Sequence, residues 1–293
     1  MKANLTSTSR LPSCPLYALV IVIAMIWALP RTAHAQLYVT NRPGGGSGAV
    51  RQYNPTTGAV INANFIVGLT REIDFGLVVS GNTLFVVDID TNTVGKYDAT
   101  TGVAIKSRFI EGLNQPEGLA VLGNTIFVAN SGDGTISKYD ATTGRAIKAS
   151  FITGLNHPEE LVVSGDALFV VNFKRNVVGK YDARTGATID ASFIAGLNEP
   201  IGLALLGNAL FVGSFGDGTI GKYDATTGAA IKTDFITGLI APQEIELLDN
   251  TLFVANSGDG TVGKYDATTG ATIDAEFITG LEFPFGMAVK SAE

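Results

Sequence analysis

The sequence predicts an all-β fold, a six-bladed β-propeller made of four-stranded antiparallel blades. The first observation is a repeat of 42 residues. A hydrophobic triplet of the type Leu-Phe-Val begins at Leu84, Ile126, Leu168, Leu210 and Leu252. An earlier copy begins at Leu37, which makes six. Six copies at this period are typical of a repeat architecture in which each copy is one supersecondary unit.

The second observation is that turn signals divide each copy into four short segments. In the third copy we expect strands over residues 119–122, 126–130, 136–139 and 146–152. They are separated by Gly123-Asn124, by the segment 131–134 and by the segment 140–144, all rich in Gly, Asn and Asp. These residues tolerate the backbone conformations that tight turns need. We find no apolar pattern with a helical period of adequate length.

The third observation is an offset between the two ends of the repeat array. The first copy starts with its second strand, Leu37–Asn41, and the last segment, Phe285–Val289, reads as an unpaired first strand. Pairing these segments would complete one blade and remove two exposed edges. Two columns of phenylalanine, represented by Phe127 and Phe151, are expected to fill the seams between blades.

The first 35 residues are predicted to be a secretory signal peptide, and residues 36–293 the propeller domain. Lys2 and Arg10 precede an apolar run over residues 16–29, and Ala33-His34-Ala35 resembles a cleavage site. The run is short for a membrane span, although an uncleaved anchor is the alternative. We therefore expect a secreted or periplasmic protein that is not held at a membrane after cleavage.

Composition excludes several kinds of function for the predicted mature chain. Cys14 is the only cysteine and lies in the signal, so disulfides, a thiol nucleophile and cysteine-bound metals are excluded. Without the first 35 residues, 17 basic and 27 acidic residues leave a net charge of −10. Such a charge argues against nucleic acid or anionic lipid as a partner. A monomer is expected.

The copies resemble two families of propeller repeats. Leu37-Tyr38-Val39-Thr40-Asn41 is similar to the YVTN repeat, and the segments 116–120 and 200–204, Pro-x-Gly-Leu-Ala, are similar to the NHL repeat. The resemblance covers nearly all of the predicted mature chain and implies a six-bladed ring of secreted bacterial type. Some six-bladed relatives are calcium-dependent lactonases and esterases. Asp-Ala-Thr-Thr-Gly is also similar to repeats of quinone-dependent dehydrogenases, but their docking tryptophan is missing once Trp27 is removed.

Candidate site residues are those at which one copy departs from the others. Aligned copies place several side chains at one mouth of the expected central channel, and the fourth copy replaces the common Ser-Gly-Asp-Gly turn. These departures predict a ligand-binding set of Phe75, Glu117, Glu159, Phe173, Lys174, Arg175, Gln243 and Phe285. Lys174 and Arg175 would hold an anionic ligand or pair with nearby glutamates.

Oxygen-bearing side chains near the same mouth suggest a possible Ca²⁺ site, since Ca²⁺ takes six to eight oxygen ligands. Its candidate ligands are Asp88, Glu117, Asn130, Glu159 and Asn172. The alternative is that these groups cap strand ends and line a solvated channel. His157 and Glu160 are candidates for moving a proton. For His157, the other histidine besides His34, the alternative is a polar surface role.

Two functions from different classes follow. The first is a non-catalytic binding or scaffold module without a cofactor, which recognises a protein, a glycan or a small molecule at the channel mouth. The alternative is a calcium-dependent hydrolase of lactones or esters.

Overall fold

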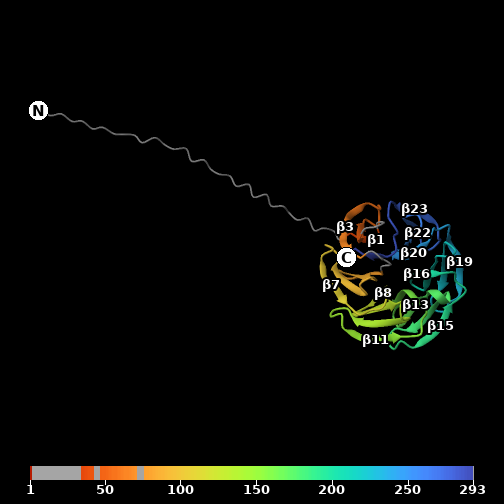
Figure 1. The fold of residues 1–293 in the computed structure, drawn as a ribbon. Helices are drawn as coiled ribbons and strands as arrows, with labels where there is room; N and C mark the ends of the chain where they lie inside the picture. Colours follow the sequence, from red (N-terminus) through yellow and green to blue (C-terminus); the bar gives the residue numbers. More distant parts are fainter. Residues whose placement is uncertain (2–33, 43–46, 71–75, 293) are drawn as a thin grey trace. The chain divides into compact units, whose positions relative to one another are not determined.

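The computed structural model describes residues 1, 34–42, 47–70 and 76–292. The chain divides into two units, Met1–Thr32 and Ala33–Glu293. The predicted signal peptide therefore falls almost wholly outside the described residues. The second unit is a ring of six four-stranded sheets, which confirms the predicted six-bladed propeller (Figure 1).

Each blade is one antiparallel sheet whose strands follow one another from the centre of the ring to its periphery. From the innermost strand outwards, blade 1 contains β24 (Met287–Lys290), β1 (Gln36–Asn41), β2 (Gly48–Tyr53) and β3 (Val60–Leu69). Blade 2 contains β4 (Leu77–Ser80), β5 (Thr83–Asp88), β6 (Thr93–Asp98) and β7 (Ala104–Ile110). Blade 3 contains β8 (Pro116–Leu122), β9 (Thr125–Asn130), β10 (Thr135–Asp140) and β11 (Ala146–Ile152).

The other three blades repeat this order. Blade 4 contains β12 (Pro158–Ser164), β13 (Ala167–Asn172), β14 (Val177–Asp182) and β15 (Thr188–Ile194). Blade 5 contains β16 (Pro200–Leu206), β17 (Ala209–Ser214), β18 (Thr219–Asp224) and β19 (Ala230–Thr237). Blade 6 contains β20 (Pro242–Leu248), β21 (Thr251–Asn256), β22 (Thr261–Asp266) and β23 (Thr272–Ile278).

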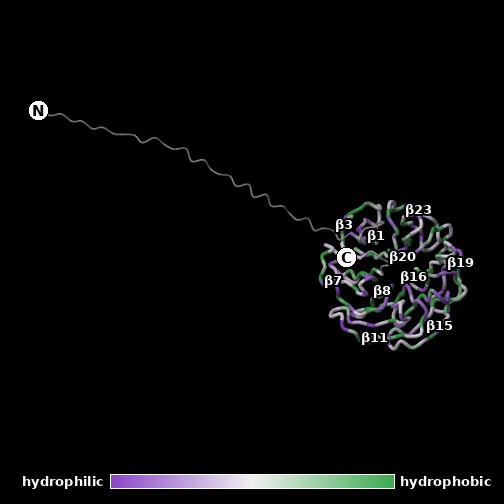
Figure 2. Tube along the Cα trace, viewed as in Figure 1, coloured by the Kyte–Doolittle hydropathy of each residue, from purple (hydrophilic) through white to green (hydrophobic). Residues whose placement is uncertain are grey.

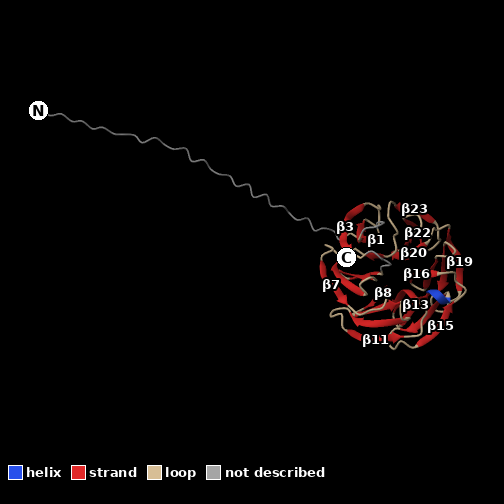
Figure 3. Cartoon of the chain, viewed as in Figure 1, coloured by secondary structure: helices blue, strands red, loops and turns tan. Residues whose placement is uncertain are grey.

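One short 3₁₀ helix, η1 (Phe173–Arg175), is the single helical element among the described residues (Figure 3). It occupies the turn at which the fourth copy departs from the others. Within the described ranges, no helix is long and apolar enough to cross a membrane.

The turn between the third and fourth strands is built by an aspartate, as its sequence predicted. In blade 3, Asp140 Oδ1 accepts hydrogen bonds from the backbone of Thr142 and Thr143, at 3.1 and 2.7 Å. Bonds from Thr143, whose hydroxyl also donates, hold the pKa of the Asp140 carboxyl below its usual value. Gly144 closes the turn with φ of +73°. A Cβ there would lie 2.4 Å from the carbonyl oxygen of Phe109 in blade 2, so only glycine fits.

The hydrophobic core is divided into six clusters, one at each seam between neighbouring blades. The cluster between blades 2 and 3, for example, joins Phe85 and Phe109 to Ile126 and Tyr139. The two phenylalanine rings lie 5.7 Å apart, and the pair recurs in blades 2 to 6. This confirms that the phenylalanine columns fill the seams. Hydrophobic and hydrophilic stretches accordingly recur around the whole ring (Figure 2).

The ring closes between β24 and β1. Leu37 pairs with Val289 and Val39 with Met287, antiparallel, so blade 1 takes its innermost strand from the far end of the sequence. The predicted closure is confirmed, although the strand begins at Met287 and not at Phe285. The innermost strands of all six blades then surround one central channel.

Candidate functional site

A bulge at the start of four innermost strands positions the site. In blade 3, Pro116 pairs with Asn130 and Leu119 with Val128, so Glu117 and Gly118 together oppose a single residue of β9. The same irregularity occurs in β12, β16 and β20. Bulges re-aim side chains at the ends of sheets. In these four blades the first bulge residue lines the channel mouth, and in blades 4 and 6 the second one also places a side chain there.

These bulge residues line a cavity of about 230 Å³, which we call the mouth cavity. All six blades contribute to it. Its lining consists of Gly76, Glu117, Gly118, Glu159, Glu160, Phe173, Ile201, Phe215, Gln243, Glu244 and Phe285. Five predicted ligand-binding residues are therefore brought together at one place: Glu117, Glu159, Phe173, Gln243 and Phe285. Phe75 lies outside the described residues.

Equivalent positions in blades 3 and 6 face the mouth cavity from opposite sides of the ring. Glu117 is 7% exposed, and its Oε1 accepts a hydrogen bond of 3.1 Å from the Ser131 hydroxyl. Gln243 is 8% exposed, and its Nε2 donates to the Ser257 hydroxyl at 3.0 Å. A serine at the end of the second strand thus fixes each side chain in the cavity wall.

His157 lies at the rim of the mouth cavity. Its Nδ1 is 2.8 Å from Glu159 Oε1, and its ring centroid is 5.7 Å from that of Phe173. The backbone at His157 is left-handed, with φ of +58°. The histidine side chain is about one third exposed, at 37%. The two predicted proton-transfer candidates are therefore placed differently, since Glu160 faces the channel interior.

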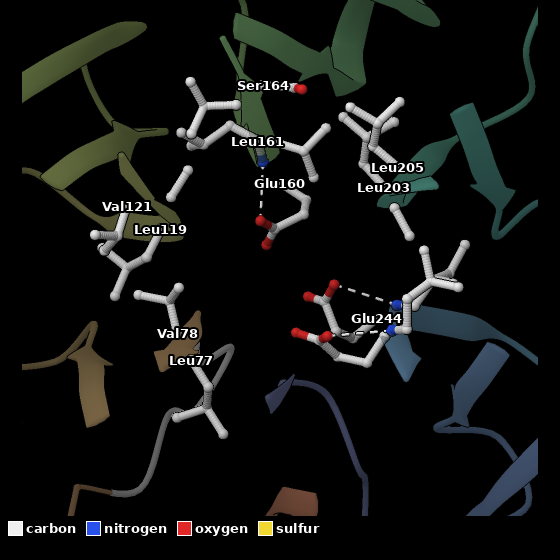
Figure 4. A pocket seen from close by; sticks show the side chains of 17 residues that line it. Leu77, Val78, Leu119, Val121, Glu160, Leu161, Ser164, Leu203, Leu205 and Glu244 are labelled. Atoms are coloured by element: carbon white, nitrogen blue, oxygen red, sulfur yellow. Dashed lines mark hydrogen bonds between the residues drawn. The ribbon is translucent and has the colours of Figure 1, made fainter. Parts of the chain in front are cut away.

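Below the mouth the channel widens into an inner cavity of about 310 Å³ (Figure 4). Glu160 and Glu244 line both cavities, and Glu246 lines the inner one. The remaining wall is mostly apolar, with Leu and Val side chains from blades 2 to 6. Each of the three carboxyl groups accepts a hydrogen bond from the next backbone N–H, at 2.9 Å in Glu160 and 3.2 Å in the other two.

Burial in this channel changes the acidity of the three glutamates. Desolvation raises the pKa of Glu160 to about 7 and that of Glu246 to about 8. The pKa of Glu244 is raised well above its usual value, first by desolvation and then by the neighbouring carboxyls of Glu160 and Glu246. The cluster therefore holds protons near neutral pH.

Glycine occupies the position of Glu160 and Glu244 in the other four copies. A Cβ on Gly118 would lie 2.5 Å from the carbonyl oxygen of Glu159, and one on Gly202 would lie 2.2 Å from that of Gln243. Neighbouring innermost strands therefore approach closely where glycine is present. Glu160 and Glu244, in blades 4 and 6, are the two places in this column where a side chain enters the channel.

Two of the predicted ligand-binding residues do not line the mouth cavity. Lys174 Nζ lies 4.5 Å from the ring centroid of Phe173, and Arg175 donates to the carbonyl oxygen of Gly154 at 3.1 Å. Neither residue pairs with a glutamate in these contacts. Both lie on η1 at the edge of the ring.

Three of the predicted Ca²⁺ ligands are engaged at strand ends and do not line the cavity. Asp88 Oδ1 accepts from Thr70 and from the backbone of Thr91. Asn130 Nδ2 donates to the Ser137 hydroxyl at 2.9 Å, and Asn172 Oδ1 accepts from the backbone of Asn156 at 2.8 Å. This is the strand-cap arrangement that the sequence left open. Among the described residues, no group of three His, Cys, Asp or Glu side chains is arranged to hold a metal ion.

Phe215, Ile201, Glu244 and Glu246 belong to the two cavities but were not in the predicted site. Glu246 could have been recognised from the sequence as a candidate site residue, because the corresponding residue in every other copy is Val or Ala. The equivalent residues Ala120 and Ala204 belong to apolar seam clusters, so a carboxyl group at this position departs from an otherwise apolar column. Phe215 follows the second strand of blade 5, where blades 3 and 6 have serine.

Comparisons with known proteins agree with the architecture. Residues 44–150 match a family model described as outer membrane protein assembly factor BamB. Among solved structures, a chain from the crystal structure of a nidogen/laminin complex superposes with a TM-score of 0.72 at 17% identity, covering 88% of this chain and 99% of that one. The computationally designed Ika8 protein superposes with a TM-score of 0.53 at 22% identity, covering 84% of this chain and 74% of that one.

These similarities concern the fold. The family match covers about a third of the sequence, and both solved structures are distant in sequence. No match was found among curated proteins. The NHL and YVTN assignments stay predictions.

Proposed function

We propose that this protein is a non-catalytic binding module that acts outside the cytoplasm and takes its ligand at the channel mouth. The observation that carries the proposal is that the shared residues and the variable residues of the repeats lie in different parts of the ring. Residues shared by the copies form turns, strand caps and seams, whereas residues that differ between copies meet in the mouth cavity. Ligand sites are concave and combine an apolar wall with a few convergent polar groups. The mouth cavity has this composition.

The proposal predicts ligand binding that depends on an open mouth. Ile201→Trp places a large side chain in the mouth cavity, and Leu122→Trp is a matched control at an exposed strand end. Saturation-transfer NMR would be recorded with choline, glucose, acetate and benzyl alcohol as representative probes. We expect binding that is lost in Ile201→Trp and kept in Leu122→Trp. Binding that survives in Ile201→Trp would contradict the proposal, as would turnover of simple esters or lactones at enzymatic rates.

A metal-dependent hydrolase is the second candidate, and the pairing of His157 with Glu159 favours it. The pair lies at the cavity rim with the geometry of a base and its orienting carboxylate. Of the five predicted Ca²⁺ ligands, Glu117 and Glu159 line the cavity. A Ca²⁺ ion held by both would polarise a bound carbonyl and lower the pKa of a bound water.

Calorimetric titration of chelator-treated protein with Ca²⁺ separates the two candidates. The binding module predicts no micromolar binding, because the other three oxygen donors are engaged at strand ends. Micromolar binding that is lost in both Glu117→Gln and Glu159→Gln would favour the hydrolase. Asp133→Asn, which removes a charge from a turn, is the control.

A further inference from the structure

We propose that the mouth cavity selects a small molecule carrying an organic ammonium group, held between the aromatic rim and the channel carboxyls. This inference rests on the proposed function and names the chemical class of its ligand. It is carried by three independent features of the cavity: its aromatic rings, its carboxyl groups and an acceptor oxygen in its wall.

The aromatic rings come from three blades. Phe173, Phe215 and Phe285 line the mouth cavity. The face of such a ring attracts cations, and quaternary ammonium groups are bound in proteins between several rings. The chain itself places cations against two of them, with Lys174 Nζ at 4.5 Å from the Phe173 centroid and Arg42 at 5.4 Å from that of Phe285. Lys174 and Arg42 contact these rings without lining the cavity.

The charge that faces the cavity is of one sign. Glu117, Glu159, Glu160 and Glu244 line it, whereas none of the described residues in its lining is Lys or Arg. The inner cavity adds Glu246, and its described lining likewise contains no basic residue. The rim histidine is already hydrogen-bonded to Glu159. An anionic ligand would meet four carboxyl groups here, whereas a cation would stabilise their ionised form.

Gln243 supplies the third feature. It is more than nine-tenths buried and lines the cavity, and its Nε2 is used by Ser257. Within the part of the chain that the structure describes, its Oε1 accepts no hydrogen bond. An acceptor left open in a cavity wall fits a ligand that donates. A hydroxyl group on a substituent of the ammonium, as in choline, donates to such an oxygen, while the ammonium matches the adjacent carboxyls in charge.

A bare metal ion fits these features less well. Phenylalanine rings do not ligate Ca²⁺ or Mg²⁺, which take oxygen ligands. The cavity volume of about 230 Å³ is also far larger than one ion. An ammonium group with organic substituents uses both the rings and the carboxyls.

The state of the carboxyl groups adds a signature for this ligand. Burial raises the pKa of Glu160 to about 7 and holds the pKa of Glu244 well above its usual value. A bound cation favours the ionised carboxylate and lowers these pKa values, so protons are released on binding. Affinity for the cation should then rise as the pH rises from 6 to 9.

The test compares choline with its uncharged carbon analogue, 3,3-dimethylbutan-1-ol, by isothermal calorimetry with the full chain. We expect choline to bind at least about tenfold more tightly than the analogue. Titration in two buffers of different ionisation enthalpy should show proton release, and the affinity for choline should be higher at pH 9 than at pH 6.

Variants then assign the site. Phe215→Leu and Glu244→Gln should each weaken choline binding about fivefold or more, while Glu276→Gln, an equal charge change on the exposed strand β23, should leave it unchanged. Equal binding of choline and the analogue would overturn the inference, as would choline binding that is insensitive to both site variants. If glucose or acetate bound at the mouth and choline did not, this inference would fail while the binding module stood. If no probe bound at the mouth, both would fail.

Discussion

The side chain of Lys96 crosses the seam between blades 2 and 3 and donates a hydrogen bond of 2.9 Å from Nζ to the carbonyl oxygen of Ala141. The same ammonium group lies 4.8 Å from the ring centroid of Phe109. Blades 3 to 6 repeat the contact, with distances from 2.9 to 3.2 Å. Blade 1 has Gln52 at this position, and there the hydroxyl of Tyr38 donates instead to the carbonyl oxygen of Ala99.

Removing this ammonium group should weaken the seam. Lys96→Met keeps most of the aliphatic stem but loses the hydrogen bond and the cation–π contact, so we expect the free energy of unfolding to fall by about 1–3 kcal/mol. Urea unfolding measures it. The control is Lys106→Met on the exposed strand β7, for which we expect a change within about 0.5 kcal/mol. Equal effects of the two substitutions would show that the seam contact contributes nothing.

Blade 4 contains a buried side-chain amide that lacks a hydrogen-bond acceptor among the described residues, and one substitution should supply that acceptor. Asn130 Nδ2 donates to Thr135 Oγ1 at 3.2 Å, but the residue equivalent to Thr135 in blade 4 is Val177. Asn172 Nδ2 is accordingly buried without a partner among the described residues. Val177→Thr should supply an acceptor at nearly unchanged volume and stabilise the protein by about 1 kcal/mol.

Thermal and urea unfolding would measure the effect of Val177→Thr. The control is Val178→Thr, which puts a hydroxyl into the fully buried seam between blades 4 and 5. It should destabilise the protein by about 1–3 kcal/mol. A loss of stability in both variants would mean that the new hydroxyl does not reach the amide of Asn172.

Removing the closing strand should open the ring. A chain without residues 285–293 lacks β24 and leaves one edge of β1 unpaired next to a hydrophobic seam. We expect aggregation or a large fall in melting temperature, because exposed edges pair with other chains. A chain shortened by residues 291–293 keeps β24 and is the control. Closure by β24 would be unnecessary for stability if both chains melted at the temperature of the full protein.

The channel glutamates should make stability depend on pH. The pKa of Glu246 is raised by burial to about 8, so the folded protein binds a proton between pH 4.5 and 8 that the unfolded chain releases. Stability is therefore expected to fall as the pH rises through this window. Glu160 and Glu244, which face Glu246 in the channel, act in the same direction. Because Glu246→Gln removes the charge, it should stabilise the protein at pH 9, by an amount on the order of a few kcal/mol, and much less at pH 5.

Unfolding in urea at the two pH values measures this difference. Glu276→Gln provides the control, because Glu276 is exposed on β23 and should show no comparable pH dependence. A stabilisation by Glu246→Gln that is equal at pH 5 and pH 9 would contradict the raised pKa.

The architecture could be predicted because the same pattern of strands and turns occurs six times in the sequence. The period, the turn residues and the phenylalanine columns all follow from local backbone preferences and from side-chain size, and the structure confirms each of them. The signal peptide and the extracellular location stay predictions, since residues 2–33 lie outside the described part of the chain.

The site could be predicted only in part, because it depends on a local shift in strand register at the start of the innermost strands. Aligned copies identified Glu117, Glu159 and Gln243, but the bulge at the start of the innermost strands is one extra residue that no composition reveals. The strand-end amides of Asn130 and Asn172 looked equally suited to a metal and to a cap. In the structure both side chains make the contacts of a strand cap. Lys174 and Arg175 stand out in the sequence, yet neither of them lines the cavity.

The pairing of β24 with β1 also depends on the number of blades in the ring. Each of the other five sheets is made from one continuous segment. Strand pairing within those sheets is therefore compatible with a ring that has one blade more or one blade fewer. In blade 1, Leu37 pairs with Val289, and this pairing requires that the five intervening blades bring the chain round a full circle. Gain or loss of a 42-residue unit would leave the pairing within each of the other sheets in place, but the pairing of β24 with β1 would then have to close a ring of a different size. This one pairing therefore links the number of repeats in the sequence to the curvature of the whole ring.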